Sequence, residues 1–181
     1  MSDLRDRLRA IPSFPAELPA FDPATTPSDP LDLLRSWLDE AIASGERAPH
    51  AFTLTTVGDD GRPASRALVM KDVDARGVHF AGRRSSRKGC HLAQRPVVGA
   101  HVFWRALGRQ VEVSGEAVAL SADESAADWL ARPTAGAAVD PDWQAWAIRP
   151  DRVEFFQAAH DRDHVRVVYL RDAGGWRRER A

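Results

Sequence analysis

The segment AFTLTTVGDDGRPASRALVMKDVDARGVHFAG, residues 51–82, determines the predicted fold. Its side chains follow the two-residue period of strands in three runs, which cover residues 51–57, about 64–72 and 78–82. Turn-forming residues at 58–61 and 74–77 separate the runs. Short strands joined by tight turns predict an antiparallel sheet, because parallel strands need long crossover connections.

The rest of the chain extends this pattern. Further strands are expected over 97–104, 110–120, 152–157 and 165–170, with a short strand at Trp176. Three helices are expected between them: Pro30 to about Gly45 with Asp29 as N-cap, Ser85 to about Gln94, and Ser121 to about Ala131. Residues 133–145 are expected to form a loop. We therefore predict a mainly β fold, an antiparallel barrel with about three flanking helices.

The N-terminal region differs in composition from the remainder. Six of the 12 prolines fall within the first 30 residues, which is unfavourable for regular helix or central strand. We predict an extended Pro-rich arm over 1–28 and a single domain over 29–181. Phe14 and Phe21 are the candidates to hold the arm against that domain.

Composition narrows the classes of function. The 25 basic and 26 acidic side chains of the 181 residues nearly cancel, which argues against a nonspecific binder of nucleic acid or membrane surfaces. No apolar run approaches the roughly 20 residues that span a bilayer. A single cysteine, Cys90, excludes an intrachain disulfide framework. These features favour a cytoplasmic protein with no nucleic-acid or membrane partner.

Two basic segments are candidates for ligand binding. Arg66 and Lys71 lie on an otherwise apolar predicted strand, where buried cations need anionic partners. The segment Ser85-Ser86-Arg87-Lys88-Gly89 opens a predicted helix, whose free N–H groups favour a phosphate. The alternatives are cations exposed at the strand ends and a solvated basic turn. Lys71 and Lys88 are the two lysines of the chain.

A third candidate lies near the C-terminus. Arg162, His164 and Arg166 are spaced by two, which on a strand puts them on one face as a cationic row for an anionic or aromatic ligand. A surface imidazole is the alternative for His164. No metal site is expected.

Seven motifs in order resemble the pyridoxamine 5′-phosphate oxidase family of FMN-binding split barrels. They are Arg66-x4-Lys71, Phe80-x4-Ser85-Ser86-Arg87-Lys88-Gly89, Phe103-Trp104, Arg109-Gln110-Val111, Arg132-Pro133, Glu154-Phe155-Phe156 and Arg162-x-His164-x-Arg166. The resemblance covers roughly residues 29–179.

The resemblance implies a homodimer with FMN in two clefts at the subunit interface. The residues implied in FMN binding are Arg66, Ala67, Leu68, Val69, Met70, Ala81, Gly82, Ser86, Arg87, Lys88, Gln110, Phe156 and Arg166. Lys71 and Arg132 are implied in binding the substrate phosphate. Arg162 and His164 are implied as substrate-binding and catalytic residues beside the pyridine ring.

The resemblance also implies a reaction. A hydride passes from C4′ of pyridoxine or pyridoxamine 5′-phosphate to the flavin, pyridoxal 5′-phosphate forms, and O2 is reduced to H2O2. The implied partners are therefore a small phosphorylated pyridine and O2.

Departures from the family pattern gather on the substrate side. Asp128 replaces a tyrosine and would repel a phosphate that it faced, and Gly136 replaces a serine. The segment between Arg132 and Glu154 is also shorter than in the family. Two alternatives therefore stay open: a related FMN oxidase acting on another aromatic substrate, as in phenazine biosynthesis, and a noncatalytic flavin-binding protein.

Overall fold

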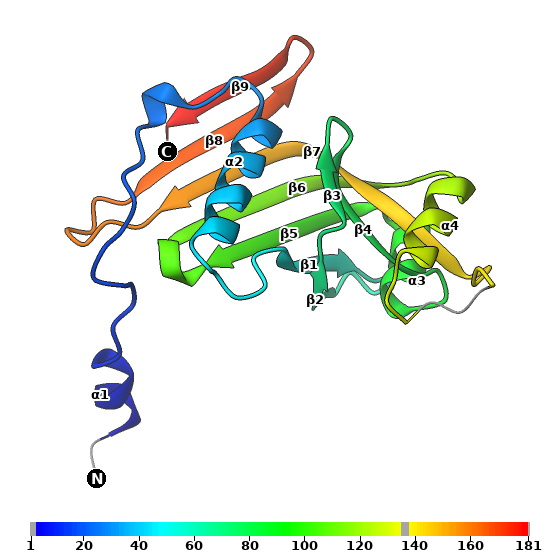
Figure 1. Cartoon of the computed structure of the whole chain (residues 1–181), viewed down its shortest axis with the longest axis horizontal. Coiled ribbons are helices and arrows are strands. Elements are labelled where there is room, and N and C mark those ends of the chain that lie inside the picture. Colours follow the sequence, from blue (N-terminus) through cyan, green and yellow to red (C-terminus); the bar gives the residue numbers. More distant parts are fainter. Residues whose placement is uncertain (1–2, 135–137, 181) are drawn as a thin grey trace.

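A computed structural model describes residues 3–134 and 138–180 of the chain. Within them, the strands form one antiparallel sheet of order β2-β1-β5-β6-β7-β4-β3, and β8 and β9 continue from β7 (Figure 1). The strands are β1 (Ala51–Val57), β2 (Pro63–Val69), β3 (Asp72–Asp74), β4 (Gly77–Arg83), β5 (Val97–Trp104), β6 (Arg109–Ala119), β7 (Trp143–Gln157), β8 (Val165–Asp172) and β9 (Gly175–Arg180). The α-helices are α1 (Leu4–Arg9), α2 (Pro30–Ala43), α3 (Arg87–Gln94) and α4 (Ala122–Leu130). The predicted antiparallel barrel is confirmed.

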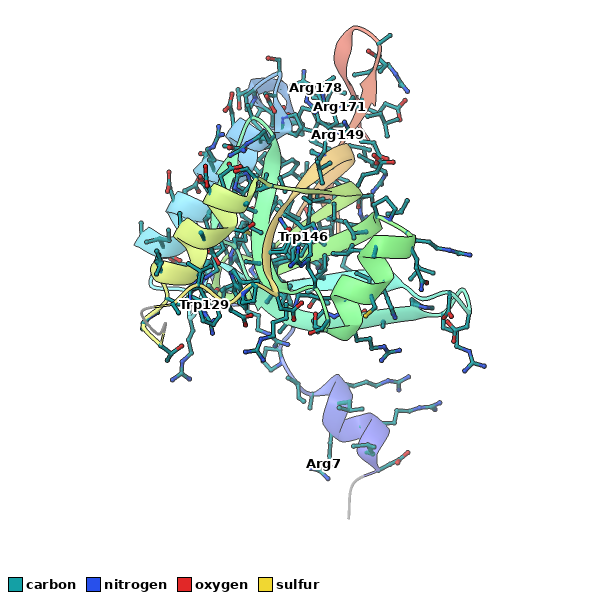
Figure 2. The ribbon with its side chains drawn as sticks, turned by 90° about the vertical axis from the view of Figure 1, so that its right-hand side faces the viewer. Arg7, Trp129, Trp146, Arg149, Arg171 and Arg178 are labelled. Carbon is teal, nitrogen blue, oxygen red and sulfur yellow. The ribbon has the colours of Figure 1, made fainter. Side chains whose placement is uncertain are left out.

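The long strand β7 closes the barrel. Its first half pairs with β4 and its second half with β8, while β6 follows it along almost its whole length. The β6–β7 register shifts between Ser114 and Gly115, a bulge that bends the pair. Gly115 permits this close approach, since a Cβ there would lie 2.1 Å from the carbonyl oxygen of Arg149. Inside the barrel, Trp146 of β7 stacks on Phe80 of β4 with ring centroids 5.4 Å apart (Figure 2).

Helix α2 lies across the sheet face formed by β5–β8 (Figure 1). Asp29 caps it as expected, because its carboxylate accepts a hydrogen bond from Leu31 N at 2.8 Å. Trp37 is buried and meets Phe155 of β7 edge-to-face at 5.2 Å. No α-helix in the described parts of the chain is long and apolar enough to cross a membrane.

The N-terminal arm is only partly extended, contrary to the prediction for residues 1–28. Helix α1 precedes the first proline, Pro12, and projects away from the barrel (Figure 1). The described chain therefore has four α-helices rather than about three. Both expected anchors make contacts: Phe21 meets Trp37 edge-to-face at 4.9 Å, and Phe14 meets His164 at 6.1 Å.

Three predicted boundaries were wrong in ways that affect the site. Strand β2 ends at Val69, so Lys71 lies in the connection to β3. Strand β7 begins at Trp143, inside the predicted loop 133–145. Ser86, rather than Ser85, caps α3. Strand β8 begins at Val165 as predicted, and Arg162 and His164 therefore precede it.

One ion pair ties α2 to the barrel. The Arg109 side chain is 3% exposed, and its Nη1 lies 2.7 Å from Oε2 of Glu40. Its Nε donates to Gln157 at 2.9 Å, and its guanidinium lies 4.3 Å from the Trp37 ring. A buried guanidinium is stable only with such partners, so Glu40 holds the helix in place.

We expect Glu40→Ala to destabilise the protein by about 2–3 kcal/mol, because the buried Arg109 loses its counter-charge. The measurement is urea unfolding followed by circular dichroism. Glu116→Ala is the matched control, since its partner Arg149 is 62% exposed and exposed pairs contribute at most about 1 kcal/mol. Equal losses in the two variants would contradict this account.

Candidate functional site

Three cationic side chains, Arg66, Arg87 and Lys88, lie close together where β2 meets the start of α3. Burial, and then the charge of Arg87, lower the pKa of Arg66. Burial, and then the charge of Arg66, lower the pKa of Lys88. None of the ion pairs in the described residues includes any of the three. A cluster of cations, two of them partly buried, that has no carboxylate partner among the described residues fits a bound anion.

The start of α3 completes this anion-binding arrangement. Ser86 Oγ accepts hydrogen bonds from Gly89 N at 3.4 Å and from Lys88 Nζ at 3.3 Å. Lys88 extends over Gly82, where an added Cβ would lie 2.1 Å from its Nζ. Cations are unfavourable at a helix N-terminus unless an anion compensates them. The arrangement therefore fits the phosphate of the expected FMN.

The remaining members of the 66–70 segment lie on β2 or directly after it. Ala67 and Val69 are on its exposed face, whereas Leu68 is half-buried and Met70 is buried in the core. Ala81 of β4 pairs with Ala145 of β7, next to Gly82. These uncharged residues can contribute backbone groups and the shape of the site to FMN binding, but no charge.

A second group lies on the neighbouring strands β6, β7 and β8. The sheet register pairs Gln110 with Phe156 and Phe156 with Arg166, so the three expected residues lie side by side. The Arg166 guanidinium lies 4.8 Å from the Phe156 ring, and its Nε is 3.2 Å from Oε1 of Glu154. A polar amide beside an aromatic wall suits a flat heterocycle such as the flavin ring.

His101 of β5 belongs to the same surface pocket and was not among the expected residues. Its Nε2 lies 3.1 Å from Oε1 of Gln110. The signal was present in the pairing of 97–104 with 110–120, because Phe103 lies opposite Gln110 and His101 is two residues away on the same face.

The expected cationic row of Arg162, His164 and Arg166 on one strand face is wrong. Arg162 has φ 69° and lies in an exposed turn, whose N–H bonds back to Ala159 O at 3.2 Å. His164 is held differently, since its Nδ1 accepts from Ala159 N at 3.0 Å and its ring lies 5.0 Å from Phe156. The turn before β8 breaks the two-residue alternation on which the prediction depended.

The N-terminal arm reaches this region. Residues 12–14 line a pocket with Arg162 and His164, and His160 Nε2 lies 3.1 Å from Ala16 O. Leu18 packs over Gly108, where an added Cβ would lie 2.6 Å from its side chain. The arm therefore covers the side on which the catalytic residues are expected.

The two cations expected at a substrate phosphate already have partners. Lys71 Nζ lies 3.5 Å from Oδ1 of Asp128, whose Oδ2 accepts from Trp143 Nε1 at 2.8 Å. Arg132 lies over two indole rings, 4.7 Å from Trp129 and 4.4 Å from Trp143. Trp129 stands at the end of α4 (Figure 2). Gly136 lies outside the described residues.

An acidic group on the β3–β4 hairpin does not need a metal to be stable. Asp72, Asp74 and His79 offer ligand atoms within 4.8 Å of one another. Burial raises the pKa of Asp74, but hydrogen bonds from Arg76 and His79 lower it to about 2. These two partners compensate the carboxylate.

Comparisons with known proteins agree with this geometry. The family described as pyridoxamine 5′-phosphate oxidase matches residues 38–157, and the pyridoxine 5′-phosphate oxidase C-terminal dimerisation region matches 143–181. Two similar proteins are the pyridoxine/pyridoxamine 5′-phosphate oxidases of Methylibium petroleiphilum and Pseudomonas paraeruginosa. Each is 34% identical, over 88% and 87% of this chain and 91% and 90% of the respective relative.

Solved structures give the same family fold. PhzG from Burkholderia lata, in complex with tetrahydrophenazine-1-carboxylic acid, superposes with a TM-score of 0.83 at 28% identity, over 91% of this chain and 98% of that one. A pyridoxamine 5′-phosphate oxidase-related, FMN-binding protein from Nostoc punctiforme has a TM-score of 0.73 at 17% identity, over 84% of this chain and 97% of that one, which supports the fold.

We expect FMN affinity to fall at alkaline pH, because Lys88 attracts a phosphate only while protonated and its pKa lies below the ordinary 10.5. Lys88→Arg should remove this alkaline loss, since a guanidinium stays charged. Lys88→Ala should weaken FMN about ten- to hundredfold at neutral pH. Flavin fluorescence titrations between pH 7 and 10 measure all three proteins. An unchanged alkaline loss in Lys88→Arg would rule out Lys88 as its source.

Proposed function

This chain belongs to the pyridoxamine 5′-phosphate oxidase family, and from that premise we propose that it oxidises pyridoxine or pyridoxamine 5′-phosphate to pyridoxal 5′-phosphate. FMN is its cofactor, and its C-terminal dimerisation region supports a homodimer. The observation that carries the cofactor assignment is the cluster of Arg66, Arg87 and Lys88, which has no carboxylate partner in the described residues.

The substrate assignment rests on four residues. Lys71 pairs with Asp128 and Arg132 lies over Trp143, whereas His164 lies beside Phe156 and Arg162 lines a pocket with His164. The curated relatives named above support the same substrate.

The chemistry divides between cofactor and protein. Bound FMN would supply the redox chemistry: the substrate carbon would lose a hydride, and the same two electrons would reduce O2 to H2O2. The protein orients the substrate against the ring. His164 is suited to this task because a backbone N–H fixes its Nδ1 and Phe156 limits its ring rotation. Residues 12–14 of the arm line the pocket that also contains Arg162 and His164.

A second substrate class is favoured by one specific observation, the Lys71–Asp128 ion pair. Lys71 and Arg132 contribute two positive charges to the proposed substrate site, and the negative charge of Asp128 offsets one of them. The remaining single charge matches a carboxylate better than a phosphate monoester, which carries about −1.5 to −2 at pH 7. PhzG, the structural relative, was crystallised with a reduced aromatic carboxylate. The second candidate is therefore an FMN oxidase of such a carboxylate.

The decisive experiment is anaerobic reduction of the bound flavin, measured as bleaching of its visible absorbance. We expect pyridoxine or pyridoxamine 5′-phosphate to bleach the flavin, and air to restore the colour with release of H2O2. Bleaching only by a dihydro- or tetrahydrophenazine carboxylate supports the second candidate. A protein that holds FMN and responds to neither class contradicts both, and leaves a noncatalytic flavin-binding role.

Asp128 is expected to set the preference between the two classes. Asp128→Asn removes the charge but keeps an oxygen that accepts from Trp143 Nε1. Lys71 is then free for a phosphate, and the KM for pyridoxine 5′-phosphate should fall about tenfold, as one charge-assisted contact is gained. Asp32→Asn, on an exposed pair with Arg35, is the control and should leave KM unchanged. An unchanged KM in Asp128→Asn would place Lys71 outside the substrate site.

A further inference from the structure

The hydroxyl of Thr56 connects Arg66 to His91, a residue that lies outside the expected phosphate-binding set. Thr56 is in β1 and fully buried. Its Oγ1 lies 2.9 Å from Arg66 Nη1 and 3.0 Å from His91 Nδ1. One buried hydroxyl therefore joins strands β1 and β2 to helix α3.

The direction of each hydrogen bond follows from the chemistry of the groups. A guanidinium only donates, so Thr56 Oγ1 accepts from Arg66. The Thr56 hydroxyl hydrogen then needs an acceptor, because a buried polar group without a partner is costly. Among the described residues, His91 Nδ1 is the remaining recorded partner of this hydroxyl. His91 Nδ1 is therefore the acceptor, and the ring hydrogen sits on Nε2.

These bonds also fix which edge of Arg66 faces the cation cluster. Arg66 Nη1 carries two hydrogens, and it donates to Thr56 Oγ1 and to Leu54 O at 3.1 Å. Both hydrogens of Nη1 are thereby used. The edge formed by Nε and Nη2 keeps three donors, and it is the edge that binds phosphate oxygens in pairs.

His91 is well placed to align this edge with the rest of the cluster. It lies one turn after Arg87 and Lys88 on α3, so a bond from His91 to β1 also sets the position of their backbone. Gly58 leaves room for the ring, since a Cβ there would lie 3.3 Å from His91 Nε2. We call the hydrogen bonds from His91 through Thr56 to Arg66 the relay. The relay fixes the positions of Arg66, Arg87 and Lys88 relative to one another.

We propose that His91 is a positioning residue for the FMN phosphate: through Thr56 it orients Arg66 so that the Nε–Nη2 edge meets the phosphate. The proposal rests on the assignment of Arg66 to that phosphate. It does not depend on which substrate the enzyme oxidises.

The test compares the affinities of FMN and riboflavin, which lacks the phosphate, by fluorescence titration of apoprotein. His91→Leu removes the acceptor and should weaken FMN about tenfold, the effect of losing one hydrogen bond in the relay, with riboflavin unchanged. His91→Asn places an amide oxygen near the former Nδ1, and should restore FMN affinity to within about threefold of wild type. Thr56→Val should behave as His91→Leu, and Thr56→Ser as wild type.

Thr55→Val is the matched control. It removes the neighbouring hydroxyl on the opposite face of β1, which bonds to Ser65 Oγ at 2.8 Å. Its FMN-to-riboflavin ratio should equal that of wild type. Since Thr56 is fully buried, thermal unfolding is followed for each variant, and half-buried His91 supplies the test if Thr56→Val does not fold.

Three results would overturn the relay: a wild-type ratio in His91→Leu, an equal loss of FMN and riboflavin, or no rescue by His91→Asn. A wild-type protein that binds FMN no more tightly than riboflavin would overturn both the relay and the phosphate assignment of Arg66. A wild-type protein with a high ratio but no oxidase turnover would count against the proposed function alone.

Discussion

The pairing of β7 with three other strands is the constraint on which both halves of the candidate site depend. Its first residues pair with β4 and its last with β8, across the bulge opposite Gly115. Trp143, at one end, joins the Lys71–Asp128 group, while Phe156, at the other, forms the aromatic wall beside Gln110. A shift of register by one residue would turn both side chains to the opposite face. The register of β7 therefore determines both the closure of the barrel and the positions of the site residues.

The two cationic groups differ in how their charge is compensated. Burial and the charge of Arg87 lower the pKa of Arg66, and burial and the charge of Arg66 lower the pKa of Lys88. Within the described residues no carboxylate pairs with Arg66, Arg87 or Lys88. Lys71 instead forms an ion pair with Asp128, and Arg132 lies over the indole rings of Trp129 and Trp143. The first group gains free energy when an anion arrives, because the repulsion and the desolvation are already present without it. The second gains less, since a ligand must compete with partners that the protein supplies.

Most of the fold was predicted correctly from patterns between residues close in sequence. Most of the errors concern features that depend on contacts between residues far apart in sequence. The Asp29 and Ser121 caps, the tight turns and the two-residue periods depend on neighbours in sequence, and they were predicted. The start of β7 was not, because Asp140, Pro141 and Asp142 have low strand propensity and directly precede it, and Trp143 to Ala145 become strand by pairing with β4. Asp128 was expected to repel a ligand, and its pairing with Lys71 depends on a contact across 57 positions that no spacing rule reveals. The predicted place of Arg162 on a strand face was wrong for a different reason, since Arg162 adopts a left-handed conformation in a turn that interrupts the two-residue alternation.

The same contrast indicates where this chain sets its specificity. The proposed site of the cofactor phosphate is built from β1, β2 and α3, whose positions are fixed by sheet register and by buried hydrogen bonds such as those of Thr56. The proposed substrate side is built from elements outside the sheet: α4, which carries Asp128, the arm, which carries Phe14, and the turn before β8. Such elements change with little effect on the barrel, because few of their residues lie in its core. A family of this fold can therefore keep one cofactor while its substrates diverge, and in the site proposed for this chain the Asp128 carboxylate is the feature that offsets the charge of Lys71.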